Sequence, residues 1–129
     1  METLADKLQV DLKPKRKVLI IIDADPRTNP RAAEAVRLAG GVCVWEQVEV
    51  SVVLHHAAAH ALSEAAADLP DSKMYKQFLP MVREKGGRVY VMPDEKTMEA
   101  LDAEVILKNH LKKPALAKLT AEAEMVMRF

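Results

Sequence analysis

The sequence predicts an α/β domain built around a parallel β-sheet, and two segments carry this prediction. Residues 18–22 are five consecutive aliphatic residues, four of them β-branched, which is typical of a strand buried on both faces. They lead at once into a helical pattern, as in the first half of a βαβ unit. Residues 48–54 alternate at first and then become wholly apolar, which indicates a second strand entering the sheet interior.

Composition favours one domain over residues 17–129, preceded by a charged arm over residues 1–16. The 19 basic and 19 acidic side chains cancel, so we expect neither nucleic-acid nor membrane partners. There is no signal-peptide pattern and no apolar run near the roughly 20 residues that span a bilayer. With Cys43 as the only cysteine, the chain suits a reducing compartment, and we expect a cytoplasmic protein with small-molecule or protein partners.

The helices and strands can be located from the capping residues, prolines and glycines at their ends. Thr28 or Asn29 caps the first helix, with Pro30 at its first position, and we expect this helix to continue past Gly40-Gly41 to Trp45. After the second strand an alanine-rich helix extends to Asp68. The remaining expected elements are a helix from 71 or 72 to 85, a strand over 88–92, a short helix over 95–101, a strand around 104–107, a helix opened by Pro114 and a strand over 125–129.

This arrangement resembles the DsrE/DsrF-like family of small α/β proteins, which includes sulfur-relay subunits. The matching pieces are VLIIIDADP with the helix NPRAAEAVRLA, the strand VEVSVVL, the passage MVREKGGRVYVMP and the ending PALAKLTAEAEMVMRF. The resemblance covers residues 17–129. It implies a three-layer α/β/α domain with a five-stranded parallel sheet, assembled into homotrimers or homohexamers.

The chain departs from the family at one position. Family members that carry sulfur hold it on a cysteine at or just after the third strand, and residues 91–98 of this chain contain none. A persulfide needs a thiolate, which neither a thioether nor a hydroxyl can replace. Cys43 lies between Val42 and Val44 in a predicted helix, where a buried free cysteine behaves as a small hydrophobe.

In parallel sheets ligands bind beyond the carboxyl ends of the strands, where the candidate site residues of this chain gather. We expect a ligand groove lined by Asp23, Asp25, His55, His56, Met92 and Thr97. Ordinary structural roles compete with this interpretation. Aspartates at strand ends and before proline commonly stabilise turns, and histidines at a strand end commonly face solvent.

Three histidines, His55, His56 and His60, form the most specific cluster. On an α-helix His56 and His60 would face the same way and could share a metal. The metalloprotease pattern would need a glutamate at Ala57, and no glycine-rich phosphate loop follows the first strand. We therefore expect no cofactor.

Three functions remain open on the sequence. The leading hypothesis is a DsrE-like cytoplasmic oligomer that acts as a binding or accessory protein related to sulfur metabolism and is not itself a persulfide carrier. The first alternative is a small enzyme or metal-binding protein that uses His55, His56 and His60. The second is a structural partner subunit of a hetero-oligomer.

Overall fold

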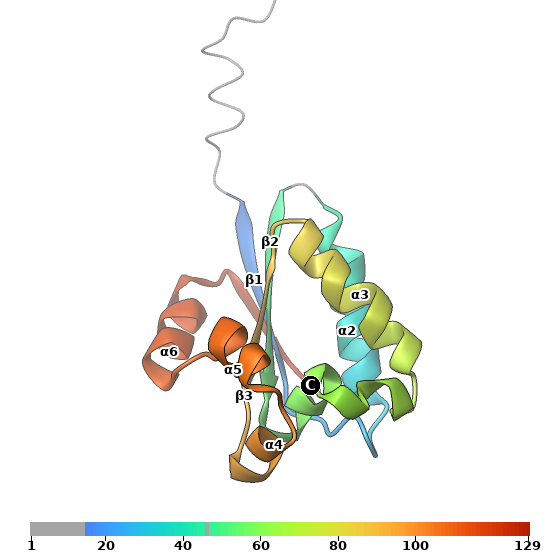
Figure 1. The fold of residues 1–129 in the computed structure, drawn as a ribbon. Coiled ribbons are helices and arrows are strands. Elements are labelled where there is room, and N and C mark those ends of the chain that lie inside the picture. Colours follow the sequence, from blue (N-terminus) through green and yellow to red (C-terminus); the bar gives the residue numbers. More distant parts are fainter. Residues whose placement is uncertain (1–14, 46) are drawn as a thin grey trace, which may run out of the picture.

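A computed structural model describes residues 15–45 and 47–129, and these form three layers (Figure 1). The central layer is a parallel sheet with strand order β3-β2-β1-β4, made of β1 (Arg16–Ile22), β2 (Val48–His55), β3 (Arg88–Met92) and β4 (Met125–Arg128). Helices α2 (Arg31–Cys43) and α3 (Ser72–Glu84) cover one face, and α6 (Lys113–Glu122) covers the other. Helix α5 (Ala103–Asn109) lies beside edge strand β3, and its Val105 and Ile106 pack against the core under α2 and α3. The short segments η1 (His56–Leu62), η2 (Glu64–Asp68) and α4 (Glu95–Glu99) lie toward the carboxyl edge.

Strand β1 lies inside the sheet, as its two-sided hydrophobicity predicts. It pairs with β2 on one side and with β4 on the other. Ile20 and Ile22 belong to the large apolar core under α2 and α3, whereas Leu19 and Ile21 belong to a smaller core under the α5–α6 connection and α6. Alternate side chains of one strand therefore hold the two helical layers on the sheet.

The expected five-stranded sheet is wrong, because the described residues form four strands. Residues 104–107 lie in helix α5 instead of a strand. As a helix, this segment places Val105 and Ile106 against the core and leaves Leu107 86% exposed. A Glu104–Lys108 ion pair at 2.7 Å supports the helical turn. The fifth position beside β3 holds one isolated bridge, between Val91 and His110.

The expected alanine-rich α-helix is also wrong in type. It consists of two 3₁₀ segments, η1 and η2, separated at Ser63, whose backbone is extended. Ala58, Ala59 and Ala61 are buried. These small side chains allow η1 to pack closely on the end of the sheet, and this packing outweighs the α-helical propensity of alanine.

Helix α2 continues past its glycines, as expected, and ends at Cys43. The helix begins one residue later than expected, because Pro30 is its N-cap residue, without a side-chain cap, and Arg31 is its first position. Asn29 Oδ1 accepts the Arg31 N–H at 3.0 Å just before the helix. Gly40 is buried where α2 meets α3. A Cβ atom there would lie 2.3 Å from the Phe78 ring, so the close contact of the two helices requires glycine.

Most of the expected N-terminal arm, residues 1–14, lies outside the described residues. Strand β1 begins at Arg16, one residue inside the segment assigned to the arm. Within residues 15–45 and 47–129, none of the helices combines the length and the apolarity needed to cross a bilayer.

The adjacent glycines of α2 provide a matched pair of substitutions. We expect Gly40→Ala to lower the free energy of unfolding by about 1 to 3 kcal/mol, because the new methyl group clashes with the Phe78 ring. Gly41→Ala should raise it by up to about 1 kcal/mol, because nothing lies within 4 Å of its Cβ position and alanine favours the helix. Urea denaturation of both variants measures the two changes. Equal effects would contradict the close contact of α2 with α3.

Candidate functional site

The carboxyl edge of the sheet holds a side-chain network centred on Asp23, the first residue after β1. Asp23 Oδ1 lies 2.5 Å from His55 Nδ1, at the end of β2. Arg128 Nε, at the end of β4, donates to the other carboxylate oxygen, Oδ2, at 2.6 Å. Three neighbouring strands thus contribute one side chain each to a single cluster.

The strand register explains why these residues meet. Ile22 lies beside Leu54 in the sheet, so Asp23 and His55 leave adjacent strands together. Arg128 lies beside Ile21. The chain end secures this pairing, because the Phe129 carbonyl accepts the backbone N–H groups of Asp23 and Ala24.

The partners of Asp23 determine its charge. Burial raises the pKa of this carboxyl, but hydrogen bonds and charge from Arg128 and His55 outweigh burial and lower the pKa below its ordinary value. Asp23 is therefore ionised at neutral pH. When His55 Nδ1–H donates to this carboxylate, the other ring nitrogen, Nε2, stays free for a ligand.

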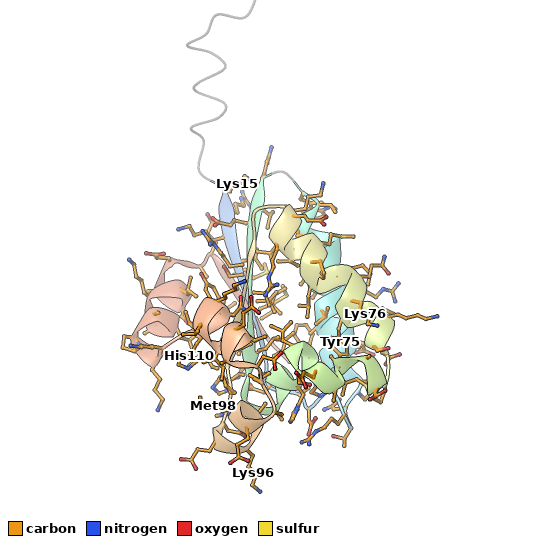
Figure 2. The ribbon with its side chains drawn as sticks, in the orientation of Figure 1. Lys15, Tyr75, Lys76, Lys96, Met98 and His110 are labelled. Carbon is orange, nitrogen blue, oxygen red and sulfur yellow. The ribbon has the colours of Figure 1, made fainter. Side chains whose placement is uncertain are left out.

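A cavity of about 310 Å³ opens beside His55, between the ends of β2 and β3 and the connection from α5 to α6. Its polar lining comes from His55, His56, His110, Lys112 and Lys113. The rings of His55 and His56 are 3.7 Å apart between centroids. Figure 2 labels His110, which follows α5 and lies beside β3. The apolar lining comes from Met92, Pro93 and Leu111.

The structure therefore brings together Asp23, His55, His56 and Met92, four of the residues expected to line a groove. Asp25 and Thr97 have other contacts. The Asp25 carboxylate is bound by the Arg27 guanidinium, with Nε at 3.0 Å from Oδ1. Thr97 is buried, and its N–H donates to Asp94 Oδ1, which caps α4.

His60 lies near Asp25, Arg27 and Asp94, and these charges act on it. Burial, followed by the positive charge of Arg27, lowers the pKa of His60, so the ring is neutral at pH 7. His56 and His60 belong to a 3₁₀ segment, in which residues three apart, and not four, share a face. No cluster of three or more potential metal ligands occurs in the described part of the chain. A metal shared by His56 and His60 stays a prediction.

Sequence reasoning missed four residues of this region, namely Arg128, His110, Lys112 and Lys113. Arg128 had a signal, because it ends a parallel strand and so must lie at the carboxyl edge. The other three follow a segment assigned to the wrong element, and only the bridge of His110 to Val91 places them beside β3.

Cys43 is buried near the end of α2, as expected. Its Sγ lies 3.1 Å from the Gly40 carbonyl oxygen, to which the thiol donates. Burial raises the pKa of this thiol, against a smaller opposing effect of the Lys85 charge. Cys43 is therefore protonated and shielded, the opposite of what a reactive thiolate needs.

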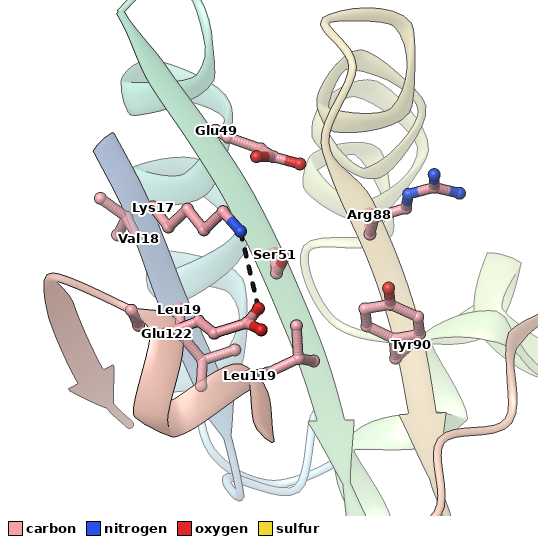
Figure 3. A pocket seen from close by; sticks show the side chains of 10 residues that line it. Lys17, Val18, Leu19, Glu49, Ser51, Arg88, Tyr90, Leu119 and Glu122 are labelled. Atoms are coloured by element: carbon pink, nitrogen blue, oxygen red, sulfur yellow. Dashed lines mark ion pairs between the residues drawn. The ribbon is translucent and has the colours of Figure 1, made fainter. Parts of the chain in front are cut away.

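A second, smaller hollow of about 90 Å³ lies on the α6 side of the sheet, near the amino ends of the strands. Figure 3 shows Glu49 and Ser51 of β2 beside Arg88 and Tyr90 of β3, with Lys17 paired to Glu122 of α6 at 3.5 Å. Here the helices leave part of the sheet uncovered. This explains why the first half of β2 alternates polar and apolar residues while residues 52–54 are wholly apolar.

Comparison with known proteins agrees with this architecture. A family model described as the DsrE/DsrF-like family matches residues 16–129. Among solved structures, the crystal structure of the ychN protein from E. coli aligns with a TM-score of 0.66 and 15% sequence identity, covering 89% of this chain and 99% of that one. No curated protein matches the chain.

The network around Asp23 predicts a stability that depends on pH. The pKa of Asp23 is lowered in the folded chain, so its carboxylate stabilises the fold above about pH 4, and this contribution is lost as the pH falls through the folded pKa. We expect Asp23→Asn to lower the free energy of unfolding by about 1 kcal/mol at neutral pH. The difference from wild type should shrink near pH 3.

Urea denaturation at both pH values measures this effect. Asp68→Asn, at an exposed carboxylate, is the matched control and should change stability little at either pH. A loss at Asp23 that is equal at both pH values would show that charge does not hold the network together.

Proposed function

The chain belongs to the DsrE/DsrF-like family, and from this premise we propose that it is a cytoplasmic binding or accessory protein of sulfur metabolism that does not itself carry a persulfide. Its partner is a small molecule or a protein that engages the carboxyl edge of the sheet. The family suggests the metabolic setting. The contacts of this chain's own residues support the rest of the proposal.

The state of Cys43 carries the proposal. A sulfur carrier needs an accessible thiolate, whose sulfur attacks the terminal sulfur of a donor and displaces the donor's thiolate. The only cysteine of the chain is buried and donates its thiol hydrogen to Gly40. The segment after β3, where the resemblance would place a carrier cysteine, contains Pro93, Asp94 and Thr97, and none of these can hold sulfane sulfur.

The contact between Asp23 and His55 favours a second candidate function. A carboxylate on Nδ1 orients an imidazole so that Nε2 can exchange protons or ligate a metal, as in many enzymes. This would make the chain a small enzyme or metal-binding protein. Calorimetry with zinc distinguishes this candidate from the binding or accessory protein. The second candidate requires a zinc site whose affinity falls when His55 is replaced by alanine.

We also propose that the protein is a homo-oligomer, a trimer or hexamer. The support is a groove of about 770 Å³ between the end of α2 and edge strand β4, with a mainly apolar lining that also includes Arg16, Gln47 and Glu124. It is lined by Val42, Trp45, Met125 and Met127 among others, and Trp45 is 66% exposed. Apolar surface beside an edge strand is typical of a contact between subunits.

The proposal predicts that the folded protein does not accept sulfane sulfur. After incubation with a persulfide donor, mass spectrometry should show no adduct of about 32 Da on Cys43. The same treatment in denaturant should produce the adduct, since unfolding exposes the thiol. A stoichiometric adduct on folded protein would restore the carrier function.

A second control tests whether position alone prevents transfer. Glu95→Cys places an exposed thiol in the segment after β3 without disturbing the core. This variant should gain the adduct while folded. If it also stays unmodified, the assay, and not the burial of Cys43, explains the negative result.

If subunits meet at the groove between α2 and β4, a charged side chain placed in it should weaken the oligomer. Light scattering on the wild type should give a mass of three or six times 14.3 kDa. Trp45→Glu should shift the protein toward the monomer, because a carboxylate in the groove opposes burial. Leu107→Glu, at a side chain 86% exposed on α5, is the control and should not change the mass. A monomeric wild type would overturn the oligomer.

A further inference from the structure

The ionisable side chains that line the cavity beside His55 are all basic. Its lining brings together three imidazoles and two ammonium groups, from the end of β2, from η1 and from the connection between α5 and α6. No carboxylate lines it. Neither Lys112 nor Lys113 has an ion-pair partner among residues 15–45 and 47–129. Two positive charges thus face a cavity that holds no compensating negative charge.

Two carboxylates that interact with the histidines of the lining are already engaged. Asp23 binds Arg128 and His55. Asp94 caps α4 through the Thr97 N–H, and it feels the charge of His56 from outside the cavity. Within the described residues these groups leave the lysines and His110 without a partner of opposite charge. A negatively charged group in the cavity would supply that partner.

The start of helix α6 adds to this preference. The helix runs from Lys113 to Glu122, and no side chain caps its first turn. Pro114 in this turn has no N–H, so the backbone donors there are those of Lys113 and Ala115, and with the positive end of the helix dipole they lie beside the two lysines. Charge, free backbone donors and imidazole N–H groups all favour an anion at the same place.

The rest of the cavity lining is apolar. It consists of Met92, Pro93 and Leu111, and Leu111 is fixed there because its N–H donates to the Val91 carbonyl at 3.0 Å. The volume of about 310 Å³ exceeds the roughly 30 Å³ that one water molecule occupies in the liquid about tenfold. A bare inorganic ion would leave this wall unused.

We infer that the cavity binds a small organic anion, a carboxylate or sulfonate with a short apolar chain. The anionic group lies against Lys112, Lys113 and His110, and the apolar chain lies against Met92 and Leu111. His55 also lines the cavity, with its Nδ1 held by Asp23. This inference rests on the proposed binding function and names the chemical class of its ligand.

Titration with butanesulfonate and butyrate, followed by amide chemical shifts in NMR spectra, tests the inference. We expect shifts centred on residues 110–113 and on Met92, for one or both probes. Sulfate lacks the apolar chain and should bind about fivefold more weakly. Butanol lacks the charge and should not bind. Sulfate that binds as tightly as both organic anions, or no binding by any probe, would overturn the inference.

Two variants locate the charge contact. Lys113→Gln should weaken the organic anions about fivefold, which corresponds to about 1 kcal/mol. Lys118→Gln removes the same charge from the same helix outside the cavity and should leave binding unchanged. Equal weakening in both variants would show attraction to the overall charge alone and would contradict the assigned contact.

The two proposals can fail separately. If Cys43 takes up sulfane sulfur in folded protein while butanesulfonate still binds at residues 110–113, the proposed function is wrong and the anion site stands. If Cys43 refuses sulfur and no organic anion binds, the anion site is wrong and the absence of carrier chemistry stands.

Discussion

Burial of strand β1 on both faces is the constraint on which the other elements depend. Its backbone pairs with β2 and β4, and its side chains alternate between two apolar cores. Because the flanking strands are parallel to β1, their carboxyl ends must meet at one edge. Asp23, His55 and Arg128 therefore converge even though Arg128 lies 105 residues from Asp23 in sequence.

Elements with a strong local signal could be predicted from the sequence. The unbroken aliphatic run of β1 has one physical explanation, a strand buried on both faces, and the structure bears it out. Two elements were predicted as the wrong type for the same reason. The β-branched pair Val105 and Ile106 favours a strand, and the alanines of η1 favour an α-helix, but contacts with the sheet decided both.

The residues of the candidate site also divide into those that the sequence could predict and those that it could not. Residues that directly follow strong strands, such as Asp23 and His55, could be predicted because parallel topology alone brings them together. His110, Lys112 and Lys113 could not, because their place depends on one bridge beside β3 that leaves no pattern in the sequence. Asp25 was expected in the groove for its type and position, yet Arg27, two residues away, binds its carboxylate.

The two cores of the domain differ greatly in size. The one under α2 and α3 contains most of the buried side chains, whereas the one on the other face is centred on Leu19, Ile21, Val53 and Leu111. Layers with little buried apolar surface open locally at lower free energy than the rest of a fold. Amide hydrogens of α6, whose Leu116 and Leu119 pack on the smaller core, should therefore exchange with solvent sooner than those of α2. Since Leu111 belongs to both this core and the cavity wall, the same local opening gives a ligand a way in.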